Sequence, residues 1–167
     1  MIYTCKYQSP LGEILLAAND DALVGLWIDT QIQKSAKIIG ERYIDMETTI
    51  LTKVKAWLDR YFAGKAPSPQ ELALKPMGTP FAERVWQLLL DIPYGKTTTY
   101  GEIAKQIATE REISQMSAQA VGNAVGSNPI SIIIPCHRVI GASGNLVGYT
   151  GGLEKKIFLL KLEGHTL

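Results

Sequence analysis

The sequence has few cysteines and no long apolar run. Cys5 and Cys136 are the two cysteines in 167 residues, and no Cys-x-x-Cys motif or Cys/His cluster has metal-ligand spacing. We expect no metal. A disulfide between the two stays open, although such bonds suit secreted proteins better. With no apolar stretch near about eighteen residues and no leader pattern, we expect a soluble, cytoplasmic protein without a membrane partner.

The sequence also lacks an excess of charge of one sign. It has 17 Lys and Arg against 16 Asp and Glu, a net charge of +1, and the parts before and after residue 80 are each close to neutral. This balance counts against a large nucleic-acid footprint. DNA binding through backbone amides and helix N-termini remains open, because these groups add no formal charge.

The first part of the chain predicts a small α/β domain. Three short, β-branched stretches at 2–8, 13–19 and 22–28 are separated by turn residues, which indicates a small antiparallel sheet. From Glu47 to Phe62 apolar residues recur at helical spacing, and Gly64 can end that helix. We expect the helix to cover the sheet.

A stretch rich in proline and glycine, 63–80, has the composition of a linker. The apolar content of 46% over 167 residues is enough for two small cores. We therefore predict an N-terminal domain over 1–76 with its linker, and a C-terminal domain over 77–167.

The second part predicts a mostly α-helical domain. Thr79-Pro80 is an N-cap with proline at the first helical position, and the turn at 92–95 ends that helix. Thr99 to Glu102 has the spacing of a capping box, so a short helix should start at Tyr100. A charged loop and a second helix of small side chains at 118–126 follow. Helix, loop and helix in this order fit a helix-turn-helix.

The most informative segment places a thiol beside an imidazole. Three isoleucines at 132–134 predict a buried strand that Pro135 ends, and Cys136 and His137 come next. Free cysteine is usually a buried structural residue. An adjacent histidine, however, can generate the reactive thiolate near neutral pH. A glycine-rich stretch over 141–152 follows and suggests a pocket.

The run Pro135-Cys136-His137-Arg138-Val139 resembles the active-site signature of the O6-alkylguanine-DNA alkyltransferases. The resemblance covers about the last ninety residues, whereas the earlier residues resemble that family only in layout. The other matching pieces follow in order: Gly78-Thr79-Pro80-Phe81, Val85-Trp86, Ile92-Pro93-Tyr94-Gly95, Thr99-Tyr100-Gly101-Glu102, Ala120-Val121-Gly122, Asn128-Pro129, Gly148-Tyr149, Gly151-Gly152-Leu153 and Glu163-Gly164.

The resemblance implies a ribonuclease H-like N-terminal domain and a C-terminal domain with a DNA-binding helix-turn-helix. It implies DNA repair by direct reversal, in which the alkyl group of O6-alkylguanine in double-stranded DNA is transferred once, irreversibly, to Cys136. O4-methylthymine stays open as a second substrate. The target base must be flipped out of the duplex to be reached. No cofactor is implied, and we expect a monomer.

The resemblance also assigns catalytic roles. His137 would remove the thiol proton through a water, and Glu163 would fix the histidine tautomer. Tyr100 would donate to N3 of the departing guanine. The residues alone leave simpler alternatives open: Glu163 as a solvated charge at a helix end, and Tyr100 as a packing residue in a first helical turn.

Further residues would hold the base. By resemblance, the main-chain oxygens of Cys136 and Val139 accept from the exocyclic amine, the amide of Thr150 faces O6, and Tyr149 stacks on the ring. Asn128 would act as a hinge that ties the second helix to the active-site segment. Its simpler alternative is a turn residue before proline.

One position departs from the family pattern. Where the family has an arginine finger that fills the gap left by the flipped base, this chain has Gln119, and the loop at 107–117 is longer and more charged. Either Gln119 or this loop could replace the finger. The residues that we expect to contact DNA are Thr99, Tyr100, Gln119, Ala120, Gly122 and Asn123.

Two other classes of function compete with alkyl transfer. A non-catalytic lesion-binding module of the alkyltransferase-like kind would flip and hold a damaged base, but those relatives lack the cysteine. A small cysteine hydrolase could use Cys136, His137 and Glu163. Neighbouring Cys and His side chains usually point apart in such enzymes, so alkyl transfer is the favoured hypothesis.

Overall fold

The computed structural model describes residues 1–146 and 148–167. Within them, no helix is both long and apolar enough to cross a membrane. The chain divides into two compact units, each with its own interior. The first unit comprises Met1–Met77 and Pro129–Ile133, and the second Gly78–Asn128 and Ile134–Leu167.

The first unit is built on a four-stranded sheet with the order β3-β2-β1-β4. Strands β1 (Ile2–Ser9), β2 (Gly12–Ala18) and β3 (Leu23–Ile28) form the predicted antiparallel meander. Strand β4 (Tyr43–Asp45) was not predicted, and it pairs with β1 in parallel. The sheet is therefore mixed and not antiparallel, because the chain crosses over between β3 and β4 instead of turning back in a hairpin.

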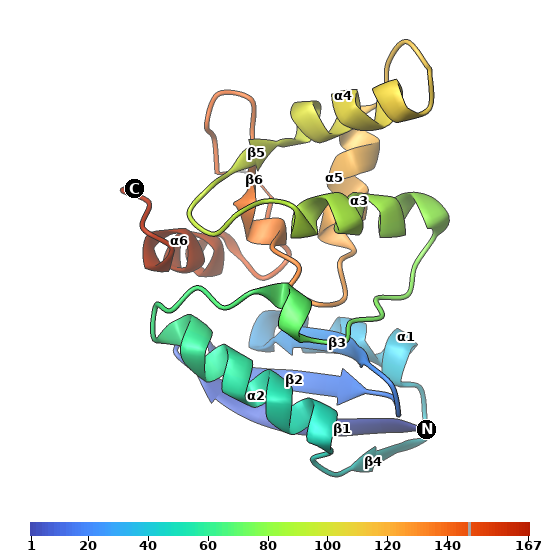
Figure 1. Ribbon diagram of the computed structural model, residues 1–167, viewed down its shortest axis with the longest axis vertical. Helices are drawn as coiled ribbons and strands as arrows, with labels where there is room; N and C mark the ends of the chain where they lie inside the picture. Colours follow the sequence, from blue (N-terminus) through green and yellow to red (C-terminus); the bar gives the residue numbers. More distant parts are fainter. Residues whose placement is uncertain (147) are drawn as a thin grey trace. The chain divides into compact units, whose positions relative to one another are not determined.

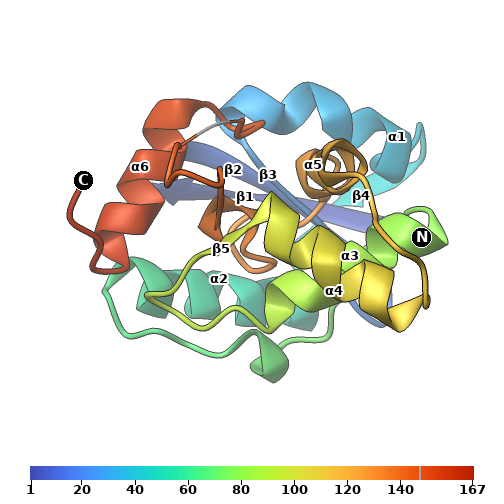
Figure 2. The same cartoon turned by 90° about the horizontal axis from the view of Figure 1, so that it is seen from above.

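Helical segments lie on both faces of this sheet (Figures 1 and 2). Helix α2 (Thr49–Phe62), which the periodicity predicted, covers one face. The 3₁₀ helix η1 (Asp29–Ser35) and the short helix α1 (Ala36–Ile39) cover the other. Strand β3 is buried at every residue because it is enclosed on both faces. Gly64 ends α2 with φ of +80°, as expected of a helix-ending glycine.

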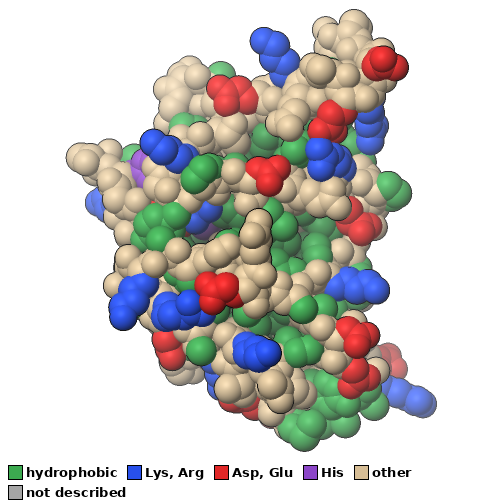
Figure 3. Space-filling view, viewed as in Figure 1, with side chains coloured by type: hydrophobic (Ala, Val, Ile, Leu, Met, Phe, Trp, Pro, Cys, Tyr) green, Lys and Arg blue, Asp and Glu red, His purple; other side chains and the backbone are tan. Residues whose placement is uncertain are grey.

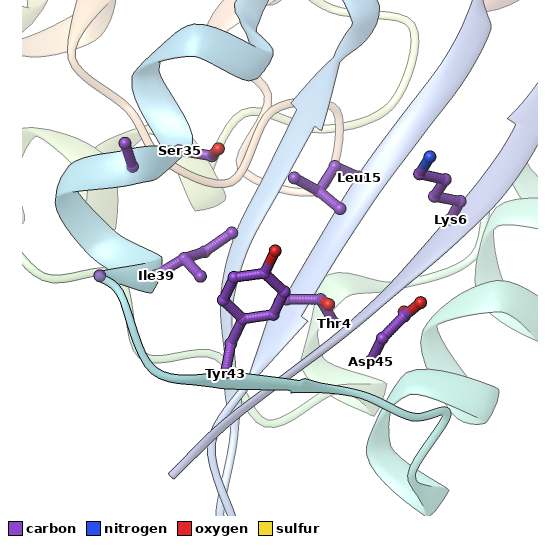
Figure 4. A pocket seen from close by; sticks show the side chains of 9 residues that line it. Thr4, Lys6, Leu15, Ser35, Ile39, Tyr43 and Asp45 are labelled. Atoms are coloured by element: carbon purple, nitrogen blue, oxygen red, sulfur yellow. The ribbon is translucent and has the colours of Figure 1, made fainter.

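A hollow of about 420 Å³ opens at the β4 edge of the sheet (Figure 4). Thr4 and Lys6 line it from β1, and Tyr43 and Asp45 line it from β4. Ser35 closes it from the side of η1. The hollow exists because β4 has only three residues and leaves most of β1 uncovered at this edge.

The segment 129–133 is attached to β3 of the first unit. Leu26 donates its N–H to the Pro129 carbonyl at 2.8 Å and accepts from the Ser131 N–H at 3.1 Å. The Ser131 hydroxyl donates to Gln31 Oε1 at 2.9 Å, and both side chains are buried. The chain that leads to Cys136 is thus held by main-chain and side-chain hydrogen bonds.

The strand predicted at 132–134 does not form, and the apolar run is instead a series of tight turns. Ile133 N–H bonds to the Ser131 carbonyl at 2.8 Å, and Cys136 N–H to the Ile134 carbonyl at 2.8 Å. Ile132 has φ of +71°, a conformation that branched residues rarely adopt. The prediction was wrong because a short buried apolar run has no period that separates a strand from a buried turn.

The second unit contains four helices among the described residues: α3 (Pro80–Leu90), α4 (Tyr100–Glu110), α5 (Ala118–Gly126) and α6 (Leu153–Leu162). A Ser or Thr hydroxyl caps each of the first three. Thr79 accepts from Ala82 N at 3.1 Å, Thr99 from Glu102 N at 3.1 Å and Ser117 from Ala120 N at 3.2 Å. These caps explain why the predicted helix starts are correct.

Helix α5 packs against both α3 and α4, and it runs across them in Figure 1. The buried indole of Trp86 on α3 donates to the Ala124 carbonyl of α5 at 2.8 Å. The small side chains of α5 allow this close approach. Helix α4 extends to Glu110, so the connection between α4 and α5 is 111–117, shorter than the loop predicted at 107–117.

Candidate active site

Cys136 begins the 3₁₀ helix η3 (Cys136–Arg138), which leads into β6 (Val139–Ile140). Strand β6 pairs in parallel with β5 (Thr98–Thr99), directly before α4. The Cys136 side chain is 3% exposed, and its sulfur is a free thiol. This pairing brings the start of α4 close to the cysteine.

Polar groups surround the Cys136 sulfur. Burial raises the pKa of the thiol, and hydrogen bonds from the side chains of Asn128 and Tyr149 oppose that rise. The positive charge of Lys156 opposes it as well. The thiol is therefore neutral at rest, but donors and a cation stand ready to stabilise a thiolate once the proton leaves.

His137 and Glu163 form a buried pair. His137 is 0% exposed, and its Nε2 lies 2.6 Å from Glu163 Oε2. A carboxylate can only accept, so Nε2 carries the proton and Nδ1 is left as an acceptor. His137 Nδ1 is buried and has no hydrogen-bond partner among the described protein atoms. One nitrogen is thus fixed by Glu163 while the other is available to take a proton.

Two pKa shifts describe this pair. Burial lowers the pKa of His137, and the Arg138 and Lys156 charges add to that effect, whereas Glu163 opposes it. For Glu163, burial acts to raise the pKa, but hydrogen bonds and charges from His137 and Arg138 lower it to about 2. At neutral pH the pair is a neutral imidazole beside a carboxylate.

The structure adds two charged residues to which the sequence assigned no role. Arg138 donates from Nε to Glu163 Oε1 at 2.7 Å and from a terminal nitrogen to the Ile92 carbonyl at 2.7 Å. Lys156 is 0% exposed and donates to the Val139 carbonyl at 2.6 Å. Burial lowers the pKa of Lys156, and the nearby Cys136 opposes that shift.

A signal for Lys156 exists in the sequence. Lys156, Leu159, Leu160 and Glu163 are spaced as one face of a helix, and all four are buried. Two charged residues on an otherwise apolar face indicate an internal polar site. Arg138 lies inside the matched motif, but nothing in the motif shows that its side chain reaches Glu163.

The remaining residues predicted to hold the base lie around the same point. Asn128 Nδ2 donates to the Ile134 carbonyl at 2.9 Å, which joins the end of α5 to the segment before Cys136. The Tyr100 hydroxyl donates to the Gly148 carbonyl at 3.3 Å, and burial raises its pKa. Val139 is buried, while Thr150 is exposed. The structure thus brings Tyr100, Asn128, Val139 and Tyr149 toward Cys136.

The residues predicted to contact DNA lie on two adjacent elements. Thr99 and Tyr100 start α4, while Gln119, Ala120, Gly122 and Asn123 lie on the first two turns of α5. A Cβ atom on Gly122 would stand 3.8 Å from the Tyr100 ring, so the two elements touch there. Gln119 and Asn123 are exposed, and both are therefore available to a partner.

No group of three or more His, Cys, Asp or Glu side chains within the described part of the chain is arranged to hold a metal ion. Both cysteines are buried free thiols, so the disulfide left open by the sequence does not form here. The chemistry of the site therefore has to come from the thiol, the His137–Glu163 pair and the polar groups around them.

Two family models match the chain. Residues 2–76 match the ribonuclease-like domain of 6-O-methylguanine DNA methyltransferase, and residues 80–165 match the DNA-binding domain of the same protein. Together these ranges cover nearly the whole sequence. The sequence resemblance in the second part is confirmed, and the first part matches the same family.

Individual relatives agree. Methylated-DNA--protein-cysteine methyltransferase of Methanosarcina acetivorans is 42% identical over 98% of this chain and 99% of its own length. The Mycobacterium leprae protein of that name is 42% identical over 99% of this chain and 94% of its own. A structure of Mycobacterium tuberculosis OGT in complex with DNA has a TM-score of 0.81 and 41% identity, covering 97% of this chain and 91% of that one. The chain therefore belongs to the 6-O-methylguanine DNA methyltransferase family.

Proposed function

We propose that Cys136 is the residue that accepts the alkyl group. The protein is a member of a family of methyltransferases, and its function is DNA repair by transfer of an alkyl group to a cysteine. The observation that carries the assignment is the buried His137–Glu163 pair directly beside Cys136. Cys5 has no histidine among its neighbours in sequence, and burial raises its pKa as well.

The transfer moves one proton and one alkyl group. His137 Nδ1 takes the Cys136 thiol proton, either directly or through a water, and the sulfur electron pair attacks the alkyl carbon. The bond from that carbon to O6 breaks, its electron pair goes to the guanine, and the proton ends on the guanine. Because the thioether is stable, each chain reacts once.

Several groups stabilise the departing guanine. The Tyr100 hydroxyl donates to N3, and the carbonyl oxygens of Cys136 and Val139 accept from the exocyclic amine. The buried Lys156 ammonium fixes the Val139 carbonyl through its bond of 2.6 Å. The Thr150 amide faces O6, with Tyr149 stacked on the ring. Asn128 keeps these parts together as the hinge.

Helices α4 and α5 serve as the helix-turn-helix that binds double-stranded DNA and flips the base. Gln119 and Asn123 project from α5 toward the groove, and the glycine and alanines of that helix permit a close approach. On the face shown in Figure 3, basic and acidic side chains are interspersed. Some basic residues are also paired, as Arg84 is with Glu110. Docking therefore depends on shape and backbone amides more than on net charge.

The two parts of the chain divide the work. The domain over 77–167 holds the reactive cysteine and the DNA-binding helices, and the domain over 1–76, with a ribonuclease H-like arrangement, supports the segment 129–133. The protein acts as a cytoplasmic monomer without metal or cofactor. O6-alkylguanine is the main substrate, and O4-methylthymine is a further candidate.

The test is intact-mass analysis after exposure to duplex DNA that carries O6-methylguanine. We expect one methyl group per chain, located on the peptide with Cys136, and no further reaction when more lesion is added. Chelator treatment should leave the yield unchanged. A protein that repaired many lesions per chain would refute the single transfer, and hydrolysis of activated esters with turnover would favour the cysteine hydrolase instead.

A further inference from the structure

Arg138 is a buried arginine that bridges two elements next to the proposed base. Its side chain is 8% exposed. Nε donates to Glu163 Oε1 at 2.7 Å, at the end of α6, and a terminal nitrogen donates to the Ile92 carbonyl at 2.7 Å, after α3. The guanidinium carbon lies 5.7 Å from the centre of the Tyr94 ring. These contacts fix the guanidinium in one place.

Glu163 is shared between two cationic or potentially cationic side chains. Oε2 lies 2.6 Å from His137 Nε2, and Oε1 accepts from Arg138. In a dry site, a carboxylate whose only neighbour is a histidine draws a proton onto that histidine, because opposite charges favour each other. An arginine is always charged, so it offsets the carboxylate without taking part in proton transfer.

The charged and titratable groups that face His137 come from three elements. Glu163 and Lys156 lie on or at the end of α6, Cys136 and Arg138 belong to η3, and Tyr94 follows α3, where it responds to the Glu163 charge. Glu163 alone among them favours the imidazolium. Arg138 is the one that both opposes it and binds it directly.

We propose that Arg138 is a positioning residue that holds Glu163 and offsets its charge, so that His137 remains a neutral base. This inference rests on the proposed role of His137 in the transfer. Without Arg138, the buried Glu163 carboxylate would keep a proton on His137. A histidine that is already protonated cannot accept the proton of Cys136.

The charge of the site also balances during the reaction. Before transfer the buried groups are neutral Cys136, neutral His137, and the Glu163–Arg138 ion pair. After proton transfer, a thiolate and an imidazolium add one charge of each sign. Arg138 thus keeps the whole cluster free of an uncompensated anion at both stages, which burial would otherwise penalise.

The experiment compares Arg138→Gln, which removes the charge, with Arg138→Lys, which keeps it. Because the chain has only two histidines, His137 and His165, NMR of the labelled imidazole carbons can follow each ring separately. A His165→Gln version assigns the signals. The second readout is the single-turnover rate of methyl transfer between about pH 5 and 9, the range that brackets histidine titration.

We expect His137 to titrate at a pH higher by about one unit or more in Arg138→Gln than in the natural protein, with a smaller change in Arg138→Lys. The acid limb of the rate profile should move by the same amount. The rate of Arg138→Gln should then fall about tenfold near neutral pH and recover in alkaline solution. Arg60→Gln, which breaks an exposed ion pair with Glu71, is the matched control and should change neither readout.

An unchanged His137 titration together with a rate reduced equally at every pH would overturn the proposal, because Arg138 would then act only on structure. An imidazolium signal for His137 at neutral pH in the natural protein would overturn it even if the variants failed to fold. A His137→Ala protein with the natural rate would instead refute the proposed base while leaving the titration result valid.

Discussion

The two cysteines of this chain are both buried, yet their surroundings differ. Cys5 lies in the middle of β1, 8% exposed, where burial raises its pKa and the carboxylates of Glu47 and Asp45 raise it further, against the Lys55 charge. Cys136 is 3% exposed, and the groups around it act in the opposite direction to burial. Burial therefore protects both thiols, and the polar neighbours decide which one can become a thiolate.

The strongest test of this comparison removes each thiol in turn. Cys136→Ser should abolish methyl transfer from O6-methylguanine, because a serine hydroxyl in the same place is far harder to deprotonate. Cys5→Ser should transfer one methyl group per chain at the natural rate. Both are measured by intact mass and peptide mapping. Methylation of Cys5 in either protein would break the comparison.

The next test removes the base and its partner. His137→Ala and Glu163→Gln should each lower the single-turnover rate by about 10²-fold or more, the usual effect of losing a general base. The affinity for undamaged duplex should stay unchanged, because neither residue is exposed. If Glu163→Gln reacted at the natural rate, Glu163 would be only a helix-end charge.

These contrasts also show what the sequence can and cannot reveal. The capped starts of α3 and α4 and the meander of β1 to β3 were predicted correctly, because their signals lie within a few neighbouring residues. The turns at 131–134 were not, since their course depends on hydrogen bonds to β3 from a hundred residues earlier. The burial of Lys156 and the reach of Arg138 to Glu163 likewise depend on packing between distant segments.

A smaller effect is expected at Tyr100. Tyr100→Phe keeps the ring and removes the hydroxyl that we propose to stabilise the departing guanine. One hydrogen bond of this kind is worth about 1 kcal/mol, so the rate should fall by about five- to tenfold. Tyr7→Phe, which loses a hydroxyl bonded to Asp59 in the first unit, is the control. A loss seen with duplex but not with the free base O6-benzylguanine would restrict Tyr100 to base flipping.

The smallest effect separates delivery of the base from the chemistry of the thiol. Gln119 is exposed on the first turn of α5, at the position where the family has an arginine that replaces the flipped base. Glutamine is shorter and uncharged, although its amide can still bond to the orphaned partner base. Flipping costs a few kcal/mol, so a weaker plug leaves the flipped state less populated.

Gln119→Arg should therefore accelerate repair of duplex O6-methylguanine by about two- to tenfold, the effect of about one added hydrogen bond. It should leave the reaction with O6-benzylguanine unchanged, because the free base needs no flipping and the surroundings of Cys136 are the same. Gln119→Ala is the matched variant and should slow only the duplex reaction. The measurement is a pair of single-turnover rates for each protein. Equal acceleration on both substrates, or none on duplex, would show that the connection at 111–117 and not Gln119 fills the gap in the DNA.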